Sequence, residues 1–106
     1  MPKYLAHVNY VGEGLKGLLK EGGSSRRAAI EKLFGSVGAK AEALYYAFGD
    51  TDLFIIVDAP DNVTVAALSL IVNATGAASV KVTVLLTPEE IDAATKKAPS
   101  YRPPGH

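Results

Sequence analysis

Hydrophobic and polar residues alternate with a period of two in several short stretches of the chain, as they do in half-buried β-strands. From Tyr4 to Tyr10, for example, every second residue is hydrophobic and can face a core. The same pattern, bounded by glycine, proline and aspartate, predicts four strands, at Lys3–Tyr10, Ala41–Phe48, Leu53–Val57 and Val80–Leu86. Gly49–Asp52 is expected to join the second and third strands as a hairpin loop.

Hydrophobic residues three and four positions apart predict helices between the strands. A short helix around Leu15–Leu19 is expected to end at Gly22–Gly23. Ser24 or Ser25 can cap the next helix, for which Gly38 is a plausible end.

Two further helices are predicted in the second half of the chain. One begins at Ala59–Asn62, runs to about Ala74–Thr75 and is closed by Gly76. The other begins at Thr87–Glu90, where a threonine cap, a proline and a glutamate have the capping-box arrangement, and runs to about Lys97.

The order of these elements is strand, helix, strand, strand, helix, strand, with additional short helices. It predicts an α+β, ferredoxin-like βαββαβ domain with helices on one face of an antiparallel four-stranded sheet. Residues 1–98 are expected to form one domain, and the proline-rich residues 99–106 a flexible or docking arm. This topology brings the 49–52 hairpin close to Arg26 and Arg27.

Composition narrows the classes of function. The 106 residues contain 11 Lys plus Arg and 11 Asp plus Glu, so no basic surface points to nucleic acid or an anionic membrane. The chain has no cysteine, which excludes disulfides and thiolate chemistry and favours a cytoplasmic location. Residues 62–80 carry no charge, but polar residues and Gly76 interrupt them, so we expect no membrane span.

The sheet face away from the helices is predicted to be too apolar to be left in water. Its expected residues are Leu5, His7, Asn9, Glu42, Leu44, Tyr46, Phe48, Asp52, Phe54, Ile56, Lys81, Thr83 and Leu85. A second copy packed sheet to sheet would cover this face and leave an apolar pocket with a few polar groups between the subunits. We therefore expect a homodimer or a larger homo-oligomer.

The helix after Pro60 supports that expectation because it carries no charge. Its buried stripe is predicted to be Val63, Ala67, Leu70, Ile71 and Ala74, with Leu68 and Val72 outside it. A helix that is apolar nearly all round is usually covered on more than one side. Either a second subunit or the C-terminal helix and tail of the same chain would cover it.

Four phrases of the sequence resemble the GYD domain family, a family of small bacterial and archaeal proteins without an assigned function. They are "MPKYL", "GLKGLLKEGGSSRRAAIEKL", "FGDTDLFIIVDAPDN" and "VLLTPEEIDAA". The resemblance implies a ferredoxin-like fold of the dimeric α/β-barrel type, and it brings no reaction with it. Gly49 and Asp52 correspond to the family's name pattern with one residue inserted, and Thr51 stands where the family usually has tyrosine.

Asp50 and Asp52 in the hairpin allow two interpretations. In the structural one, Asp50 tolerates the backbone of the turn and Asp52 accepts hydrogen bonds from nearby amides. In the functional one, Asp52 points into the intersubunit pocket, where it orients a ligand or moves a proton as a general base.

Arg26 and Arg27 oppose the helix dipole, because they place positive charge in the first turn of a helix. An anionic partner is therefore expected. It is either a carboxylate of the chain, at Glu21, Asp50 or Asp52, or the carboxylate or phosphate of a ligand.

His7 and Asn9 share the predicted open face with Tyr46 and Phe54, and these residues are candidates for lining the pocket. His7 is either a hydrogen-bonded structural group or a general base together with Asp52. No spacing of ligands indicates a metal site, and no phosphate-binding or dinucleotide motif indicates a cofactor.

Two functions fit these residues. The first is a small-molecule-binding or assembly module that forms a homo-oligomer and takes a small anionic or apolar ligand. The second is a cofactor-free enzyme of the dimeric-barrel kind, a monooxygenase, isomerase or decarboxylase acting on a small apolar acid.

Overall fold

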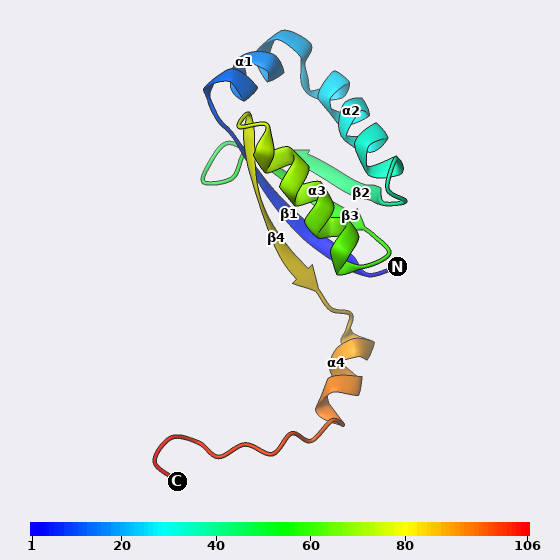
Figure 1. The fold of residues 1–106 in the computed structure, drawn as a ribbon, viewed down its shortest axis with the longest axis vertical. Helices are drawn as coiled ribbons and strands as arrows, with labels where there is room; N and C mark the ends of the chain where they lie inside the picture. Colours follow the sequence, from blue (N-terminus) through cyan, green and yellow to red (C-terminus); the bar gives the residue numbers. More distant parts are fainter.

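The structure is a computed structural model of residues 1–106, with four strands and four helices (Figure 1). In chain order the elements are β1 (Lys3–Tyr10), α1 (Gly12–Glu21), α2 (Gly23–Gly35), β2 (Lys40–Tyr46), β3 (Leu53–Asp58), α3 (Asn62–Ala74), β4 (Ala78–Leu85) and α4 (Pro88–Thr95). The strands form one sheet in the order β2-β3-β1-β4, and every neighbouring pair is antiparallel. This confirms the predicted α+β architecture with an open antiparallel sheet, which is compatible with a ferredoxin-like fold.

The core lies between the sheet and the two long helices, α2 and α3, which lie on the same side of the sheet (Figure 1). Twelve buried hydrophobic residues form it: Tyr4, Ala6, Val8, Ile30, Phe34, Ala39, Leu53, Ile55, Val57, Ala59, Val65 and Leu68. The central strands β1 and β3 contribute half of them, because both alternate regularly between a helix-side and an open-side residue. Each fully buried valine, leucine, isoleucine or phenylalanine side chain stabilises the fold by roughly 1.5–3 kcal/mol.

A β-bulge interrupts the pairing of β2 with β3. Ala41 lies opposite Val57, whereas Ala43 lies opposite Ile56, so Glu42 is an extra residue in β2. A bulge shifts the alternation of the strand by one position, and every side chain beyond it changes face.

The faces predicted for β2 were therefore wrong beyond the bulge. Tyr46 lies opposite the fully buried Leu53 and so faces the helices, together with Leu44. Tyr45 lies opposite Phe54 and faces the open side. The prediction assumed an uninterrupted alternation from Ala41 to Phe48, which the extra residue breaks.

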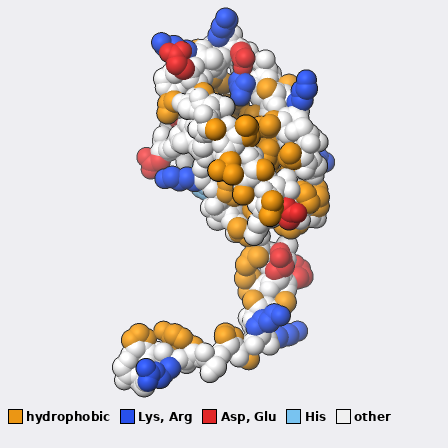
Figure 2. Space-filling view, viewed as in Figure 1, with side chains coloured by type: hydrophobic (Ala, Val, Ile, Leu, Met, Phe, Trp, Pro, Cys, Tyr) orange, Lys and Arg blue, Asp and Glu red, His pale blue; other side chains and the backbone are white.

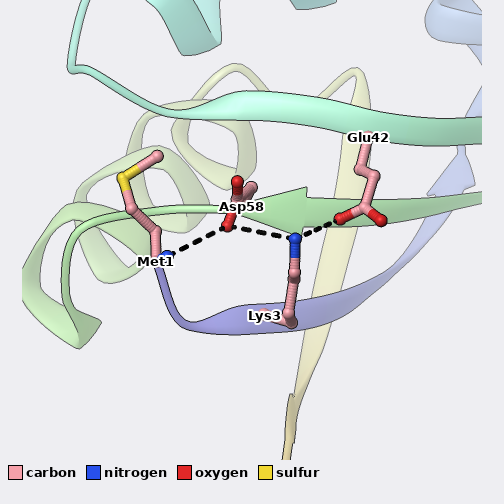
Figure 3. Close-up of polar contacts among 4 residues, drawn as sticks. All are labelled: Met1, Lys3, Glu42 and Asp58. Carbon is pink, nitrogen blue, oxygen red and sulfur yellow. Dashed lines mark hydrogen bonds and ion pairs between the residues drawn. The ribbon is translucent and has the colours of Figure 1, made fainter.

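Ionic contacts surround the bulge and connect three strands (Figure 3). Lys3 Nζ on β1 donates to Glu42 on β2 and lies 3.4 Å from Asp58 Oδ1 on β3. The amino group of Met1 lies 3.9 Å from the same carboxylate oxygen. The hydrogen bond to Glu42, helped by the nearby Asp58 charge, raises the pKa of Lys3. The cluster thus holds the extra residue of β2 against the neighbouring strands.

The face of α3 that packs on the sheet also differs from the predicted one. Val65 and Leu68 are buried, whereas Val63, Leu70 and Ile71 of the predicted stripe are 78%, 72% and 55% exposed. Without a charged residue on the helix, hydrophobic spacing alone does not select one face over another. None of the four helices is both long and apolar enough to cross a membrane.

Local helix signals were correct at α4 and wrong at α2. Thr87 Oγ1 accepts a hydrogen bond from the backbone N–H of Glu90 at 3.1 Å, and the Thr87 N–H donates to Glu90 Oε1 at 2.9 Å, which confirms the capping box. The predicted caps Ser24 and Ser25 instead lie inside α2. Its N-cap is Gly22, whose φ of 83° favours glycine and which supplies no side-chain hydrogen bond.

The chain beyond β4 leaves the domain. Every residue from Leu86 to His106 is exposed, and α4 and the tail extend away from the sheet (Figure 1). The radius of gyration is 17.0 Å, compared with about 13 Å for a compact domain of this length. We call residues 86–106 the C-terminal arm. It starts earlier than the proline-rich tail at 99–106 because it includes α4.

Candidate functional site

Asp52 connects the hairpin to the end of β1. Its Oδ2 accepts a hydrogen bond from the backbone N–H of Tyr10 at 2.9 Å. Its own backbone N–H donates to Asn9 Oδ1 and to the carbonyl oxygen of Val8, both at 3.0 Å. The side chain of Asp52 thus binds the backbone at the end of β1, and the side chain of Asn9 binds the backbone of Asp52. Asp50, in contrast, is exposed. The carboxylate of Asp52 accepts one hydrogen bond from a nearby amide, which agrees with its structural interpretation.

His7 lies on the open sheet face, half-buried between two neighbours. Its Nε2 is 3.4 Å from Thr83 Oγ1, and its ring meets Phe54 edge to face at a centroid distance of 5.4 Å. The register of β1 places Asn9 on the same face, but Asn9 Oδ1 is already bonded to the Asp52 amide. His7 therefore has a hydroxyl partner and no carboxylate that would orient it as a base.

A second candidate site lies on the opposite side of the sheet, between α2 and α3. The two helices leave a cleft of about 100 Å³ above the central strands, and 15 of its 17 lining residues are hydrophobic. Val8, Leu53 and Ile55 belong to its floor, and Leu33 and Val72 belong to the helices beside it. The polar residues of the lining are Arg26 and Ser69, so the cleft is apolar with one cation at its border.

Arg26 lines this cleft, and its charge acts on Tyr46 at the start of α2. Arg26 Nη1 lies 3.5 Å from Glu21 Oε2, and the Tyr46 hydroxyl donates to the carbonyl oxygen of Gly23 at 3.3 Å. Burial and the neighbouring Tyr10 raise the pKa of Tyr46, while the positive charge of Arg26 acts in the opposite direction. The group therefore combines one arginine with two phenols at the start of α2.

The predicted site residues thus separate into two groups. His7, Asn9 and Phe54 lie on the open face, and Arg26 and Tyr46 lie on the helix side. Arg27 belongs to neither group, because it is exposed and its Nε lies 3.9 Å from Glu31 Oε1. No three His, Cys, Asp or Glu side chains lie close enough together to hold a metal ion.

The sequence interpretation missed Tyr10 and the cleft itself. Tyr10 was assigned to the helix-side face, but nothing in the pattern indicated that α2 and α3 would leave space above it. The misplaced charge of Arg26 in the first turn of α2 was the one signal of this site. It correctly indicated a nearby anion, which is Glu21.

Comparison with known proteins places the chain in a family. The model of the GYD domain matches residues 4–95, which covers all strands and helices of the structure except the first residue of β1. Searches of the curated proteins and of the solved structures found no match. The match extends over most of the 106 residues and includes three of the four phrases that carried the resemblance in full, together with the end of "MPKYL". The chain therefore belongs to the GYD domain family.

Proposed function

We propose that this domain is a homo-oligomeric, cytoplasmic small-molecule-binding module whose ligand is a small apolar acid. The cleft between α2 and α3, with Arg26 at its border, is the observation that carries the proposal. Sites for small molecules are concave, mostly apolar and supplied with a few directed polar groups. This cleft has that composition.

The size of the cleft limits the ligand to a few heavy atoms. An apolar cavity of about 150 Å³ holds a benzene ring, and the cleft measures about 100 Å³ and opens to the surface. A short aliphatic chain fits this space. The rest of the ligand has to reach the opening, where the polar groups lie.

The positive charge of Arg26 is the reason for proposing an acid as the ligand. Glu21 takes one hydrogen bond from Arg26, which leaves further N–H donors of the guanidinium for a carboxylate. No side chain caps the first N–H groups of α2 beside it. The ligand's carboxylate then lies at Arg26 and its apolar part beside the half-buried Leu33 and Val72.

Thermal shift with matched acids and alcohols tests this site. At 100 times the dissociation constant of the acid, butanoate and pentanoate are expected to stabilise the protein by about 2.7 kcal/mol, whereas butanol and pentanol at the same concentration do so less. Arg26→Gln should remove the preference for the acid. Arg27→Gln, which changes the neighbouring arginine outside the cleft, should keep it. Equal shifts for acids and alcohols, or no shift with any of them, would overturn the proposed ligand.

The second copy is proposed to lie on the open sheet face. Leu5, Phe54 and Ile56 form a half-buried apolar row there that no helix of the chain covers, and Tyr45 beside it is exposed. Covering such a row is favourable by roughly 25 cal/mol for each Å² of apolar surface removed from water. Sheet-to-sheet packing would also enclose His7 between the subunits.

Light scattering over a dilution series tests the assembly separately from the ligand. Phe54→Glu should lower the average mass relative to the wild type at equal concentration. Phe48→Glu makes the same exchange in the exposed hairpin and should leave the mass unchanged. A Phe54→Glu variant with the mass of the wild type would remove the open face from the proposal and leave the cleft untouched.

A further inference from the structure

No residue of the C-terminal arm is buried against the domain of its own chain. All of its residues are exposed, including Leu86, Ile91 and Tyr101, which are large and hydrophobic. Figure 2 shows hydrophobic side chains along the arm, away from the domain. Its helix α4 has eight residues. Helices shorter than about 12–15 residues are marginal in water, so α4 requires a surface to pack on even with its capping box.

An uncovered helix face on the domain matches that requirement. Val63, Leu70 and Ile71 repeat at the i, i+7, i+8 spacing of a single stripe, and all three are exposed. Figure 2 shows hydrophobic side chains gathered over α3 on this face. Because the helix has no charged residue, a second helix can pack along it without burying a charge.

The connection between β4 and α4 favours a neighbouring copy over the arm's own domain. Only Leu86 and Thr87 join the two elements, and Thr87 is extended at φ −75° and ψ 160°. Pro88 disfavours the helical conformation for the residue before it, and the capping box holds Thr87 in place. In the structure this connection leads α4 away from its own α3, with all residues of α4 exposed and free to reach a second copy (Figure 1).

We infer that the C-terminal arm of one copy docks on the exposed face of α3 in a second copy. The contact is reciprocal in a symmetric pair, since each copy supplies one arm and one α3. It lies on the helix side of the sheet and goes beyond the sheet-to-sheet contact proposed above. The two contacts can therefore fail independently of each other.

Disulfide trapping in the full chain tests whether the arm of one copy docks on α3 of another. Because the chain has no native cysteine, each disulfide can be assigned to the introduced cysteines. One protein carries Ile91→Cys, and a second, of different mass through a tag, carries Leu70→Cys. Both positions are exposed, so folding should be unaffected. Docking should make the mixed disulfide form at least about tenfold faster than with Ala28→Cys, an exposed control site on α2. Val63→Cys and Ile71→Cys extend the scan along the stripe.

Three outcomes would overturn the inference. The first is equal trapping at α2 and α3. The second is the absence of mixed disulfides at every site of the stripe. The third is a chain carrying both Ile91→Cys and Leu70→Cys that closes only within itself, because the arm would then cover its own α3. Trapping that persists in a Phe54→Glu background would show that the exchange stands without the open-face contact.

Discussion

Replacing Asp52 with alanine tests whether this carboxylate has a structural role. The substitution removes the acceptor of the Tyr10 N–H, which lies 2.9 Å away, at the end of the central strand β1. Hydrogen bonds to charged groups contribute roughly 1.5–3 kcal/mol, and we expect the lower end because Asp52 is only half-buried and water can replace part of the bond. A loss of about 1.5 kcal/mol lowers the melting temperature of a domain of this size by roughly 6–12 °C.

Two companion variants separate the acceptor from its charge and its position. Asp52→Asn keeps an oxygen at the same distance along the side chain, and it should lose about half as much stability because a neutral acceptor forms a weaker bond. Asp50→Ala changes the exposed aspartate of the same hairpin and should stay within about 0.5 kcal/mol of the wild type. Urea unfolding with an unchanged m-value measures all three. The structural interpretation is refuted if Asp52→Ala is as stable as the wild type or cannot be distinguished from Asp50→Ala.

Three further predictions concern packing and ionisation. Gly14→Ala would place a Cβ 2.0 Å from the carbonyl oxygen of Ala77, so α1 has to shift. Urea unfolding should show a loss of stability of about 1–3 kcal/mol. A gain in stability from helix propensity would contradict the close approach of Gly14 to Ala77. Leu53→Ala should lower the free energy of unfolding by about 2–5 kcal/mol in the same measurement, because Leu53 is fully buried. A loss below about 1 kcal/mol would contradict this and would mean that the core closes around the missing side chain. Near-ultraviolet titration of Tyr46→Phe should lose one phenol, which ionises above the ordinary tyrosine pKa of about 10. Because the pKa of Tyr46 is raised in the folded state, its contribution to stability is complete below the unfolded pKa and is lost as pH rises through the folded pKa. A lost phenol whose pKa is not raised would contradict this prediction for Tyr46.

The strands and caps could be predicted because their signals are local. Every second residue from Tyr4 to Tyr10 is hydrophobic, and β1 has the predicted bounds Lys3–Tyr10 in the structure. The Thr87 capping box depends on four consecutive residues and is present. The order of these elements then limited the topology to a small set, of which the antiparallel sheet β2-β3-β1-β4 is one.

Two failures have a common physical origin in degenerate patterns. In β2, Leu44, Tyr45 and Tyr46 are all large and hydrophobic, so either phase of the alternation was acceptable, and only the pairing partners reveal the bulge. In α3, either the face with Val63 or the face with Val65 could be the buried one, and in the structure Val65 packs on the sheet. A periodicity fixes an orientation only where polar residues occupy the other face.

The cleft was not predictable for a different reason. Whether α2 and α3 pack together or diverge depends on how each helix sits on the sheet, and no spacing in the sequence reports that. The position of Arg26 was informative because a cation at a helix start is unfavourable without an anion. Its neighbour Arg27 carries the same sequence signal, yet it pairs along its own helix with Glu31 and lines nothing.

The bulge at Glu42 has a consequence for how the protein avoids fibres. β2 and β4 are the two edges of the sheet, and an exposed regular edge recruits further strands from other chains. The extra residue makes the β2 edge irregular, with Lys40 and Glu42 exposed along it, and β4 presents Lys81. Deleting Glu42 would restore a regular ladder, so we expect that variant to fail through amyloid-like aggregation at high concentration.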